Sequence, residues 1–318
     1  MTASLQSRAY ARVLMVGLGA VAKTHVRVLE TMPFADVVAG VDTDTSKTLK
    51  THGVNRPVYP TVREARDAAC VPDVVVIATP TPNHAAVCRE TARYFPEARL
   101  LVEKPAAVNL SDARHILAEI GGRQPVDVTY HMSFSPEVTW GQEVVQKSKA
   151  ALGDLISAEL FFADPYYTDF EHAEATLCSS WLDSGINALS VLSRFATITE
   201  RLSLRSMGTE RQSIFEARLT CHTGGRQANA LLVTSWYVAD AAKTTRLRYA
   251  SGLELLMDHT GVAAYLLRDG KVEAFFGADR SIPRRERHYR ALYQSWLAEG
   301  KRTLPAETGL QLHEILLG

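Results

Sequence analysis

The chain has 318 residues, of which 46% are hydrophobic and 22% charged, an ordinary globular composition with enough length for two domains. Lysine and arginine together number 35, as do aspartate and glutamate, so no net field attracts nucleic acid or an anionic membrane. The lack of a membrane-length apolar stretch or an apolar signal core, together with four scattered cysteines, leads us to expect a cytoplasmic protein without a metal site.

The first element predicted along the chain is a buried strand that leads through a glycine-rich turn into a helix. The run RVLMVG, residues 12–17, has the length and valine content of a strand in a parallel sheet. After the turn, Val21, Val26 and Leu29 recur at helical spacing. A strand, turn and helix in this order is the setting in which nucleotide phosphates bind at a helix amino terminus.

The turn itself, VGLGAVAKTH, matches two nucleotide-binding motifs that predict different chemistry. Gly17 with the pair Lys23 and Thr24 nearly fits a P-loop. Gly17, Gly19 and Ala22 fit the dinucleotide fingerprint G-x-G-x-x-G/A. A P-loop needs glycine directly before its lysine, where Ala22 stands, whereas the fingerprint tolerates alanine at its third position because only close helix packing is required there. The sequence therefore favours a dinucleotide.

Asp42 ends the next predicted strand, DVVAGV, at the distance from the glycines where an acidic residue binds the adenosine ribose. Its negative charge would repel a 2'-phosphate, and Thr43 and Thr45 supply no positive charge in compensation. We therefore expect NAD rather than NADP as the cofactor. The alternative is a solvated aspartate in the turn VDTDTS without a role in binding.

Strands and helices continue to alternate up to about residue 130. The further strand-like runs are DVVVIAT, RLLVEK and VDVTY, and the helical segments between them include TPNHAAVCRETARYF and NLSDARHILAEIG. This alternation predicts an α/β Rossmann domain over residues 1–130, with a doubly wound parallel sheet covered by helices on both faces.

One of these strands ends at LLVEKPAAV and places Glu103 and Lys104 at the sheet edge where open α/β proteins bind ligands. Pro105 interrupts the strand and fixes the direction of the lysine before it. A lysine that is partly desolvated beside a nicotinamide ring exchanges a proton near neutral pH. The alternative is a surface lysine at a strand end.

After about residue 150 the pattern changes to long strands in succession, separated by turn residues such as TGGR and RDGK. The runs are DLISAELFFADP, RLSLRSMGTE, SIFEARLTCHTG, QANALLVTSWY, TTRLRYAS, LELLMDH and VAAYLLRDG, with one helical insertion, WLDSGINALSVLSRF, and two helical stretches after Pro283. We expect an α+β domain over residues 131–318 with an open, mostly antiparallel sheet. An uncovered sheet face with apolar side chains, such as those of ALLVTSWYV, predicts a homo-oligomer, either a dimer or a tetramer.

The segments GLGAVAKTH, ATPTPNHAAVCRETA and LVEKPAAV, in this order and spacing, resemble the Gfo/Idh/MocA family of glucose-fructose oxidoreductase and inositol dehydrogenase relatives. The resemblance covers the whole chain, because these proteins also have a carboxy-terminal open sheet. It implies an NAD-dependent oxidoreductase with Lys104 as the proton-handling residue. The residues that it implies for cofactor binding are Gly17, Gly19, Ala20, Val21, Asp42, Thr79, Pro80, His84 and Glu103. For His84, a histidine that caps its own helical turn is an almost equal alternative.

The third motif of the family, an Asp and a His one helical turn apart, is WLDSGINALS in this chain. Asp183 is present, but Asn187 stands in the histidine position; an amide cannot take a proton and can only orient a hydroxyl. The spacing places both side chains on one helical face. The pattern resembles the aldose 1-dehydrogenase branch of the family, the D-galactose and L-arabinose dehydrogenases, which oxidise a pyranose to a lactone. Ser184 and Met132 depart from that branch.

The resemblance implies that Lys104, helped by Asp183, accepts a hydroxyl proton as hydride leaves, while Asn187 holds the hydroxyl in line. His131 and Tyr166 are further candidate substrate contacts, although aromatic residues at strand spacing, as in FFADPYY, are more often core. Two other functions remain open. One is a ketoreductase of a modified or nucleotide-linked sugar in a biosynthetic pathway, and the other is a catalytically inactive regulatory protein that senses NAD and sugar.

Overall fold

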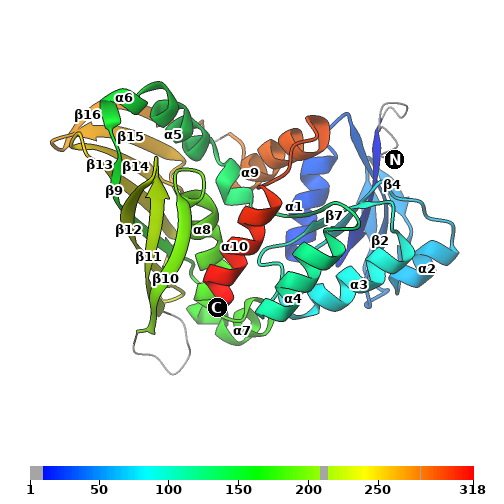
Figure 1. The fold of residues 1–318 in the computed structure, drawn as a ribbon. Coiled ribbons are helices and arrows are strands. Elements are labelled where there is room, and N and C mark those ends of the chain that lie inside the picture. Colours follow the sequence, from blue (N-terminus) through cyan, green and yellow to red (C-terminus); the bar gives the residue numbers. More distant parts are fainter. Residues whose placement is uncertain (1–9, 208–213, 280) are drawn as a thin grey trace. The chain divides into compact units, whose positions relative to one another are not determined.

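The computed structural model describes residues 10–207, 214–279 and 281–318, which form two compact units (Figure 1). The first unit comprises the described residues up to Thr129 together with Tyr289–Leu310, and the second comprises Tyr130–His288 and Gln311–Gly318. The division falls twice within helices near the carboxyl end of the chain, in α9 (Arg284–Tyr293) and α10 (Ala306–Leu317).

Among its described residues, the first unit forms a six-stranded sheet in the order β5-β2-β1-β6-β7-β8, with every neighbouring pair parallel. The strands are β1 (Ala11–Val16), β2 (Ala35–Val41), β5 (Val58–Tyr59), β6 (Val74–Ile77), β7 (Arg99–Val102) and β8 (Val126–Val128). The side chains of β6 are fully buried, which explains its unbroken run of valine and isoleucine. The predicted Rossmann sheet is confirmed.

Helices connect the strands of this sheet, and local capping explains where several of them begin. They are α1 (Ala20–Leu29), α2 (Val62–Asp67), η2 (Thr81–Asn83), α3 (His84–Tyr94), α4 (Leu110–Arg114) and the π-helical η3 (His115–Ile120). The π-helical η7 (Gln294–Ala298), from near the carboxyl end of the chain, also belongs to this unit. Thr61 caps α2 by accepting a hydrogen bond from the backbone N–H of Glu64, and Asn109 caps α4 in the same way. A short hairpin, β3 (Leu49–Thr51) with β4 (Val54–Arg56), was not expected from the sequence.

The described part of the second unit forms an eight-stranded sheet in the order β10-β11-β12-β9-β13-β14-β15-β16. The strands are β9 (Leu155–Ala163), β10 (Thr197–Ser206), β11 (Ile214–Thr223), β12 (Arg226–Ser235), β13 (Ala242–Tyr249), β14 (Leu253–Asp258), β15 (Ala263–Arg268) and β16 (Lys271–Gly277). The pair β12 and β9 is parallel and the other neighbouring pairs are antiparallel, as the mostly antiparallel sheet of the sequence prediction requires.

Two predicted hairpin turns are confirmed by their backbone conformations. Gly224 and Gly225 have φ of 57° and 86° between β11 and β12, and Asp269 and Gly270 have φ of 49° and 73° between β15 and β16. Two central residues with positive φ match the right-handed twist of the strands, which glycine and aspartate tolerate best. The predicted runs RLSLRSMGTE and SIFEARLTCHTG also include residues 208–210 and 213, which lie outside the described residues.

Of the helices of the second unit before β10, the sequence predicted only the insertion WLDSGINALSVLSRF. These helices are η4 (His131–Phe134), α5 (Pro136–Lys147), α6 (Lys149–Leu152), η5 (Tyr167–Asp169), α7 (Phe170–Leu177), the π-helical η6 (Trp181–Gly185) and α8 (Ile186–Leu192). The insertion WLDSGINALSVLSRF thus begins with a π-helical turn and continues as α8. The sequence predicted no element for η4, α5, α6, η5 or α7, and it also missed the edge strand β16, whose residues are all exposed or half-buried.

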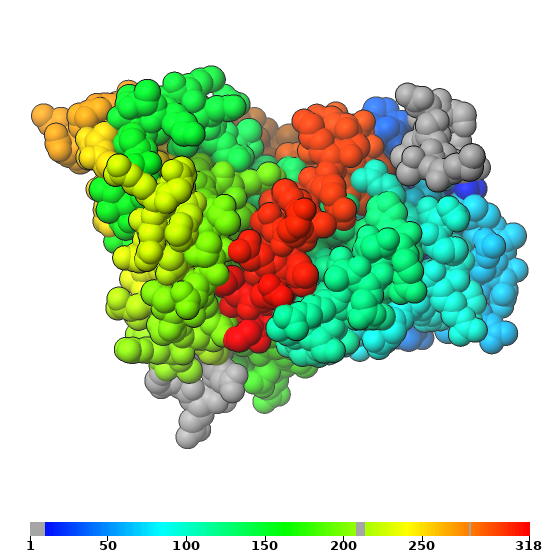
Figure 2. Space-filling view, viewed as in Figure 1, coloured from blue at the N-terminus to red at the C-terminus, as the bar shows by residue number. Residues whose placement is uncertain are grey.

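The strands at the two ends of the second sheet, β10 in yellow-green and β16 in orange, reach the surface in Figure 2. Phe275 of β16 is 73% exposed, and Ile156, Phe161 and Leu202 are also exposed apolar side chains of this sheet. Of the predicted segment ALLVTSWYV, the side chains of Leu231 and Val233 are half-buried. In the described ranges, no helix is both long enough and apolar enough to span a membrane.

Candidate functional site

The strand order of the first sheet reverses between β1 and β6, and open α/β sheets bind ligands at the carboxyl ends of such strands. Gly17 directly follows β1 with φ of 86°, and its N–H donates to the carbonyl oxygen of Val41 at 2.8 Å. A Cβ atom on Gly17 would lie 2.7 Å from the carbonyl oxygen of Ala78, after β6. The close approach of two backbone segments therefore requires glycine at this position.

Gly19 is a glycine for a different reason. It is the N-cap of α1, and a Cβ atom built there would meet no atom within 4 Å in the described part of the chain. Gly19 and Ala20 are exposed at this helix end, Val21 is half-buried, and Ala22 is buried where the helix packs on the sheet. Open space over the free N–H groups of a helix amino terminus fits the pyrophosphate of a dinucleotide.

Asp42 follows β2 and contacts the glycine turn with one carboxylate oxygen and its own turn with the other. Its Oδ2 accepts the N–H of Leu18 at 2.7 Å and its Oδ1 accepts the N–H of Asp44 at 2.9 Å. Burial alone would raise the pKa of Asp42, but these bonds and the Lys47 ammonium lower it. A carboxylate accepts about four hydrogen bonds, so room remains for one ribose hydroxyl.

The charge beside Asp42 differs from the sequence expectation. Lys47 Nζ lies 2.9 Å from Asp42 Oδ2. Thr43 and Thr45 alone had predicted that no positive charge would offset the Asp42 carboxylate. Lys47 was visible in the segment VDTDTSK. The turn that brings it back onto Asp42 is held by Asp44, whose Oδ1 accepts a hydrogen bond from the N–H of Ser46 at 3.1 Å.

The segment after β6 combines a candidate cofactor contact with a structural histidine. Thr79 Oγ1 is buried without a hydrogen-bond partner among the described atoms, and Pro80 is exposed. The ring of His84 is fully buried; its Nε2 lies 2.9 Å from the carbonyl oxygen of Thr79 and its Nδ1 lies 3.0 Å from that of Pro105. Burial lowers the pKa of His84 against the effect of these bonds. His84 thus braces the loops that carry Thr79 and Pro105, and a direct cofactor contact stays a prediction.

Glu103 is a buried structural centre. Its Oε1 accepts from Tyr289 OH at 2.6 Å and lies 2.8 Å from His25 Nε2. Tyr293 OH lies 2.6 Å from the other ring nitrogen of His25. Burial alone would raise the pKa of Glu103, but the contacts with His25 and Tyr289 lower it to about 2. These partners could not be predicted from the sequence, because Tyr289 and Tyr293 are distant from Glu103 in the chain.

Lys104 follows β7 at the edge predicted from the sequence. Its side chain is half-buried, and the peptide bond to Pro105 is cis. The backbone N–H of Lys104 donates to Glu103 Oε2 at 3.1 Å and to Thr129 Oγ1 at 3.2 Å. The Glu103 network therefore fixes the backbone from which the lysine side chain extends.

In the second unit, Asp183 lies in η6 and Asn187 in the first turn of α8, and both side chains are 4% exposed. Asn187 Nδ2 donates to the backbone carbonyl of Asp183 at 3.2 Å. Asn187 Oδ1 is buried without a hydrogen-bond partner among the described atoms. A buried acceptor in this state costs free energy unless a donor reaches it, so it is suited to a ligand hydroxyl.

Tyr166, one of the two predicted substrate contacts, lies at the start of η5 and is linked to Asp183. Burial first, and then the charges of Asp183 and Asp164, raise the pKa of Tyr166 well above its usual value, whereas a hydrogen bond with Arg285 acts against them. Its ring packs edge-on against Trp236, with centroids 5.6 Å apart. In FFADPYY, Phe162 is fully buried core, whereas Tyr167 is exposed and stacks on Tyr237.

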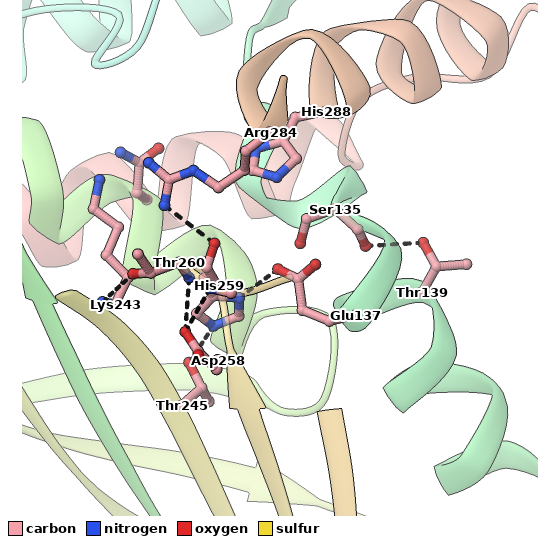
Figure 3. A network of polar contacts seen from close by, with 12 residues as sticks. Ser135, Glu137, Thr139, Lys243, Thr245, Asp258, His259, Thr260, Arg284 and His288 are labelled. Carbon is pink, nitrogen blue, oxygen red and sulfur yellow. Dashed lines mark hydrogen bonds and ion pairs between the residues drawn. The ribbon is translucent and has the colours of Figure 1, made fainter. Parts of the chain in front are cut away.

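His131, the other predicted contact, lies in η4 with its Nδ1 3.4 Å from His288 Nδ1. Burial, followed by the charge of Arg284, holds the pKa of His288 well below its ordinary value. Figure 3 shows the neighbouring network, in which His259 lies between Glu137, at 2.7 Å, and Thr245, at 2.9 Å.

Three polar residues near Asp183, namely Asp164, Ser184 and Lys243, were not predicted as site residues from the sequence. Lys243 Nζ donates to Asp164 Oδ1 at 2.7 Å, and Ser184 Oγ donates to Asp164 Oδ2 at 2.8 Å. A signal for Lys243 existed. The strand AKTTRLRY alternates buried and half-buried residues, and the lysine falls in the buried row with Thr245 and Leu247.

Comparison with known proteins bears on the first unit most directly. Residues 11–128 match the model of GFO_IDH_MocA, described as an oxidoreductase family with an NAD-binding Rossmann fold. Residues 11–128 are thus similar to the NAD-binding domain of this family, and we call them the Gfo/Idh/MocA segment. The Gfo/Idh/MocA segment contains the glycine turn, Asp42 and Lys104, so the predicted NAD-binding Rossmann domain of an oxidoreductase is confirmed for these residues.

Solved structures extend the likeness to the fold of both units around the Gfo/Idh/MocA segment. An oxidoreductase from Agrobacterium radiobacter, in complex with NAD+, L-tartaric acid and magnesium, has a TM-score of 0.77 at 16% identity over 96% of this chain and 94% of that one. UDP-N-acetylglucosamine 3-dehydrogenase from Acidithiobacillus ferrooxidans has a TM-score of 0.74 at 16% identity, covering 97% and 96%. Scyllo-inositol dehydrogenase from Lactobacillus casei, with NAD(H) and scyllo-inositol, has a TM-score of 0.73 at 18% identity, covering 96% and 95%. No curated protein matched the chain.

Proposed function

We propose that the protein is an NAD-dependent sugar dehydrogenase that oxidises an aldose at its anomeric carbon to a lactone. The observation that carries the proposal is Asn187 Oδ1, a buried acceptor without a partner among the described atoms, one helical turn from Asp183. An amide accepts the hydrogen bond of a substrate hydroxyl without competing for its proton. This suits a reaction in which another group removes that proton.

Three features of the first unit fit NAD. They are the open space over Gly19 at the amino terminus of α1, the remaining lone pair of Asp42, and the unpartnered hydroxyl of Thr79. Gly17, Gly19, Ala20 and Val21 would hold the pyrophosphate, Asp42 the ribose, and Thr79 and Pro80 the nicotinamide half. NAD, when bound, supplies the acceptor for the hydride.

The chain's own residues then have separate roles. Lys104 accepts the proton of the reacting hydroxyl, and Asp183 assists that transfer. Asn187 orients the hydroxyl, while His131 and Tyr166 bind other parts of the substrate. Orientation supplies most of the rate, and proton transfer adds about 10²- to 10⁴-fold.

Incubation of the protein with NAD and a panel of substrates tests this function. We expect D-galactose, L-arabinose or a related aldose to produce reduced nicotinamide absorbance. The runner-up, a reductase of modified or nucleotide-linked sugars, predicts turnover only with such a sugar, oxidised with NAD or reduced in its keto form with NADH. The likeness to the UDP-N-acetylglucosamine enzyme puts UDP-N-acetylglucosamine in the panel. Binding of NAD without turnover of any member would contradict both and leave the sensor function.

Asn187→Ala should lower kcat/KM roughly ten- to a hundredfold, because a hydrogen bond at the reacting centre contributes about 1 to 3 kcal/mol. The shape of the pH profile should persist, because an amide does not titrate. Asn187→His should lower the activity of a site built around an amide. An inactive parent that gains activity with histidine would instead identify a decayed dehydrogenase. Steady-state kinetics of both variants on D-galactose, L-arabinose and myo-inositol decides between these outcomes.

We further propose that Asp42 favours NAD over NADP and that Lys47 limits this preference. The ammonium of Lys47 partly offsets the carboxylate that would repel a 2'-phosphate. We expect Lys47→Ala to raise the ratio of kcat/KM for NAD to that for NADP about threefold to tenfold, and Asp42→Ala to lower it. Lys50→Ala, on the neighbouring strand β3, is the matched control. A parent that uses NADP as well as NAD would refute the preference.

We propose a homo-oligomer in the cytoplasm as the working form. Exposed apolar side chains of the second sheet, such as Phe161 and Phe275, support burial against a second copy. The four cysteines are unpaired, which suits a reducing compartment. Sedimentation of the purified protein measures the oligomeric state, and a monomer at micromolar concentration would contradict the assembly.

A further inference from the structure

A buried ion pair lies where two central strands of the second sheet, β9 and β13, end and begin. Asp164 directly follows β9, and Lys243 is near the start of the antiparallel neighbour β13. Lys243 Nζ lies 2.7 Å from Asp164 Oδ1, and the two side chains are 7% and 10% exposed. In Figure 3 the Lys243 side chain extends toward the guanidinium of Arg284.

The ion pair is connected to the π-helical turn η6. Ser184 Oγ donates to the second oxygen of Asp164 at 2.8 Å, and Ser184 is the neighbour of Asp183 in the chain. Two other bonds hold this turn: Ser180 Oγ lies 3.0 Å from Thr234 Oγ1, and Trp181 Nε1 donates to the carbonyl of Leu316 at 2.8 Å. Those bonds involve residues before Asp183, whereas the Ser184 bond holds the residue that directly follows it.

Charged groups around the ion pair change the pKa of Lys243 and of Tyr166. Burial lowers the pKa of Lys243, while Asp164 and Asp183 oppose this effect and Arg284 adds to it. Tyr166 is influenced by Asp183 and Asp164. A buried ion pair is weak evidence for stability, because the loss of hydration offsets most of the attraction between the charges. Its position beside Asp183 therefore calls for a role other than stability.

We propose that Lys243, Asp164 and Ser184 are positioning residues for the reaction, a buried strut that holds the Asp183 carboxylate in its working orientation. Lys243 supplies the charge that fixes Asp164, and Asp164 holds the Ser184 hydroxyl and with it the backbone of η6. Lys243 also offsets the repulsion between Asp164 and Asp183. The inference rests on the proposed role of Asp183 in the sugar dehydrogenase.

Ser184→Ala and Lys243→Met break the strut at its two ends. We expect kcat to fall about tenfold to a hundredfold with KM changed less than about threefold, because a positioning residue acts on the reacting geometry. Loss of the Lys243 charge should also change the pH profile, because the carboxylates of Asp164 and Asp183 lose a nearby positive charge. In an Asp183→Asn background the same changes should lower kcat less than about threefold, because the group that they position is already altered.

Two further variants separate an effect on folding from an effect on positioning. Lys243→Met combined with Asp164→Asn removes both charges and keeps an acceptor for Ser184, so its Tm should stay near that of the parent while kcat stays low. Asp127→Asn is the matched control. Asp127 is a buried carboxylate of the first unit that binds Trp296 Nε1 at 2.9 Å, and its loss should lower Tm without altering the pH profile.

Hydrogen exchange gives a readout that does not require turnover. Peptides covering residues 181–187 should exchange at least about tenfold faster in Ser184→Ala and Lys243→Met than in the parent and the Asp127→Asn control. Unchanged exchange would overturn the strut even if no sugar is turned over. If the parent is active, Ser184→Ala and Lys243→Met should lower kcat more with Asp183 present than with Asp183→Asn. Equal falls of kcat in the two backgrounds would overturn the positioning role and leave the proposed function standing. A parent inactive on every sugar contradicts the proposed function alone.

Discussion

Lys104→Ala is expected to abolish turnover while leaving the affinity for NAD within about tenfold of the parent. Removal of a group that acts on the proton in the transition state lowers kcat by at least about a hundredfold. The cofactor contacts lie elsewhere, in the turn from Gly17 to Val21 and at Asp42, and the backbone of Lys104 is fixed by Glu103 and Thr129. Turnover followed by absorbance and NADH binding followed by fluorescence separate the two effects.

Lys50→Ala is a control for this variant, because Lys50 is an exposed lysine of β3 in the same unit. Its kcat and cofactor affinity should equal those of the parent. Substantial turnover by a folded Lys104→Ala protein would refute the role of Lys104. Loss of NAD binding by that variant would instead assign the lysine to the cofactor site.

Glu103→Gln is expected to destabilise the first unit by about 2 to 4 kcal/mol, because it disturbs a buried carboxylate that several donors share. Glu103 Oε1 has Tyr289 and His25 as partners, and Oε2 accepts the N–H of Lys104. An amide offers one acceptor oxygen and turns an N–H group toward the remaining donors. Urea unfolding at neutral pH measures the loss.

The same carboxylate sets a pH dependence. Folding lowers the pKa of Glu103 from 4.5 to about 2, so its contribution to stability is complete above pH 4.5 and is lost as the pH falls toward 2. The contribution amounts to about 3 kcal/mol, and the free energy of unfolding of the parent should decline by up to this amount over that window. Glu103→Gln should show a flatter decline, and the exposed Glu97→Gln should follow the parent. Identical acid profiles of Glu103→Gln and the parent would contradict this role.

The pattern of apolar residues in the sequence was enough to predict both sheets. Unbroken apolar runs such as β6 indicate strands buried on both faces, and alternating strands with positive-φ turns at Gly224 and Gly270 indicate hairpins. Both patterns are local, so they need no knowledge of the partner strand. β16 was missed because its side chains are mostly exposed and therefore carry no clear alternation.

The sequence by itself determined the dinucleotide turn, the acidic residue after β2, the lysine after β7 and the asparagine in place of a histidine. Each of these depends on residues close together in the chain, where spacing reports geometry directly. Only the tertiary structure decided which buried groups surround them: His25 and Tyr289 around Glu103, and Lys243 with Asp164 behind Ser184. A hydrogen bond or ion pair between distant segments leaves no periodic trace, because its partners meet only when sheets and helices pack.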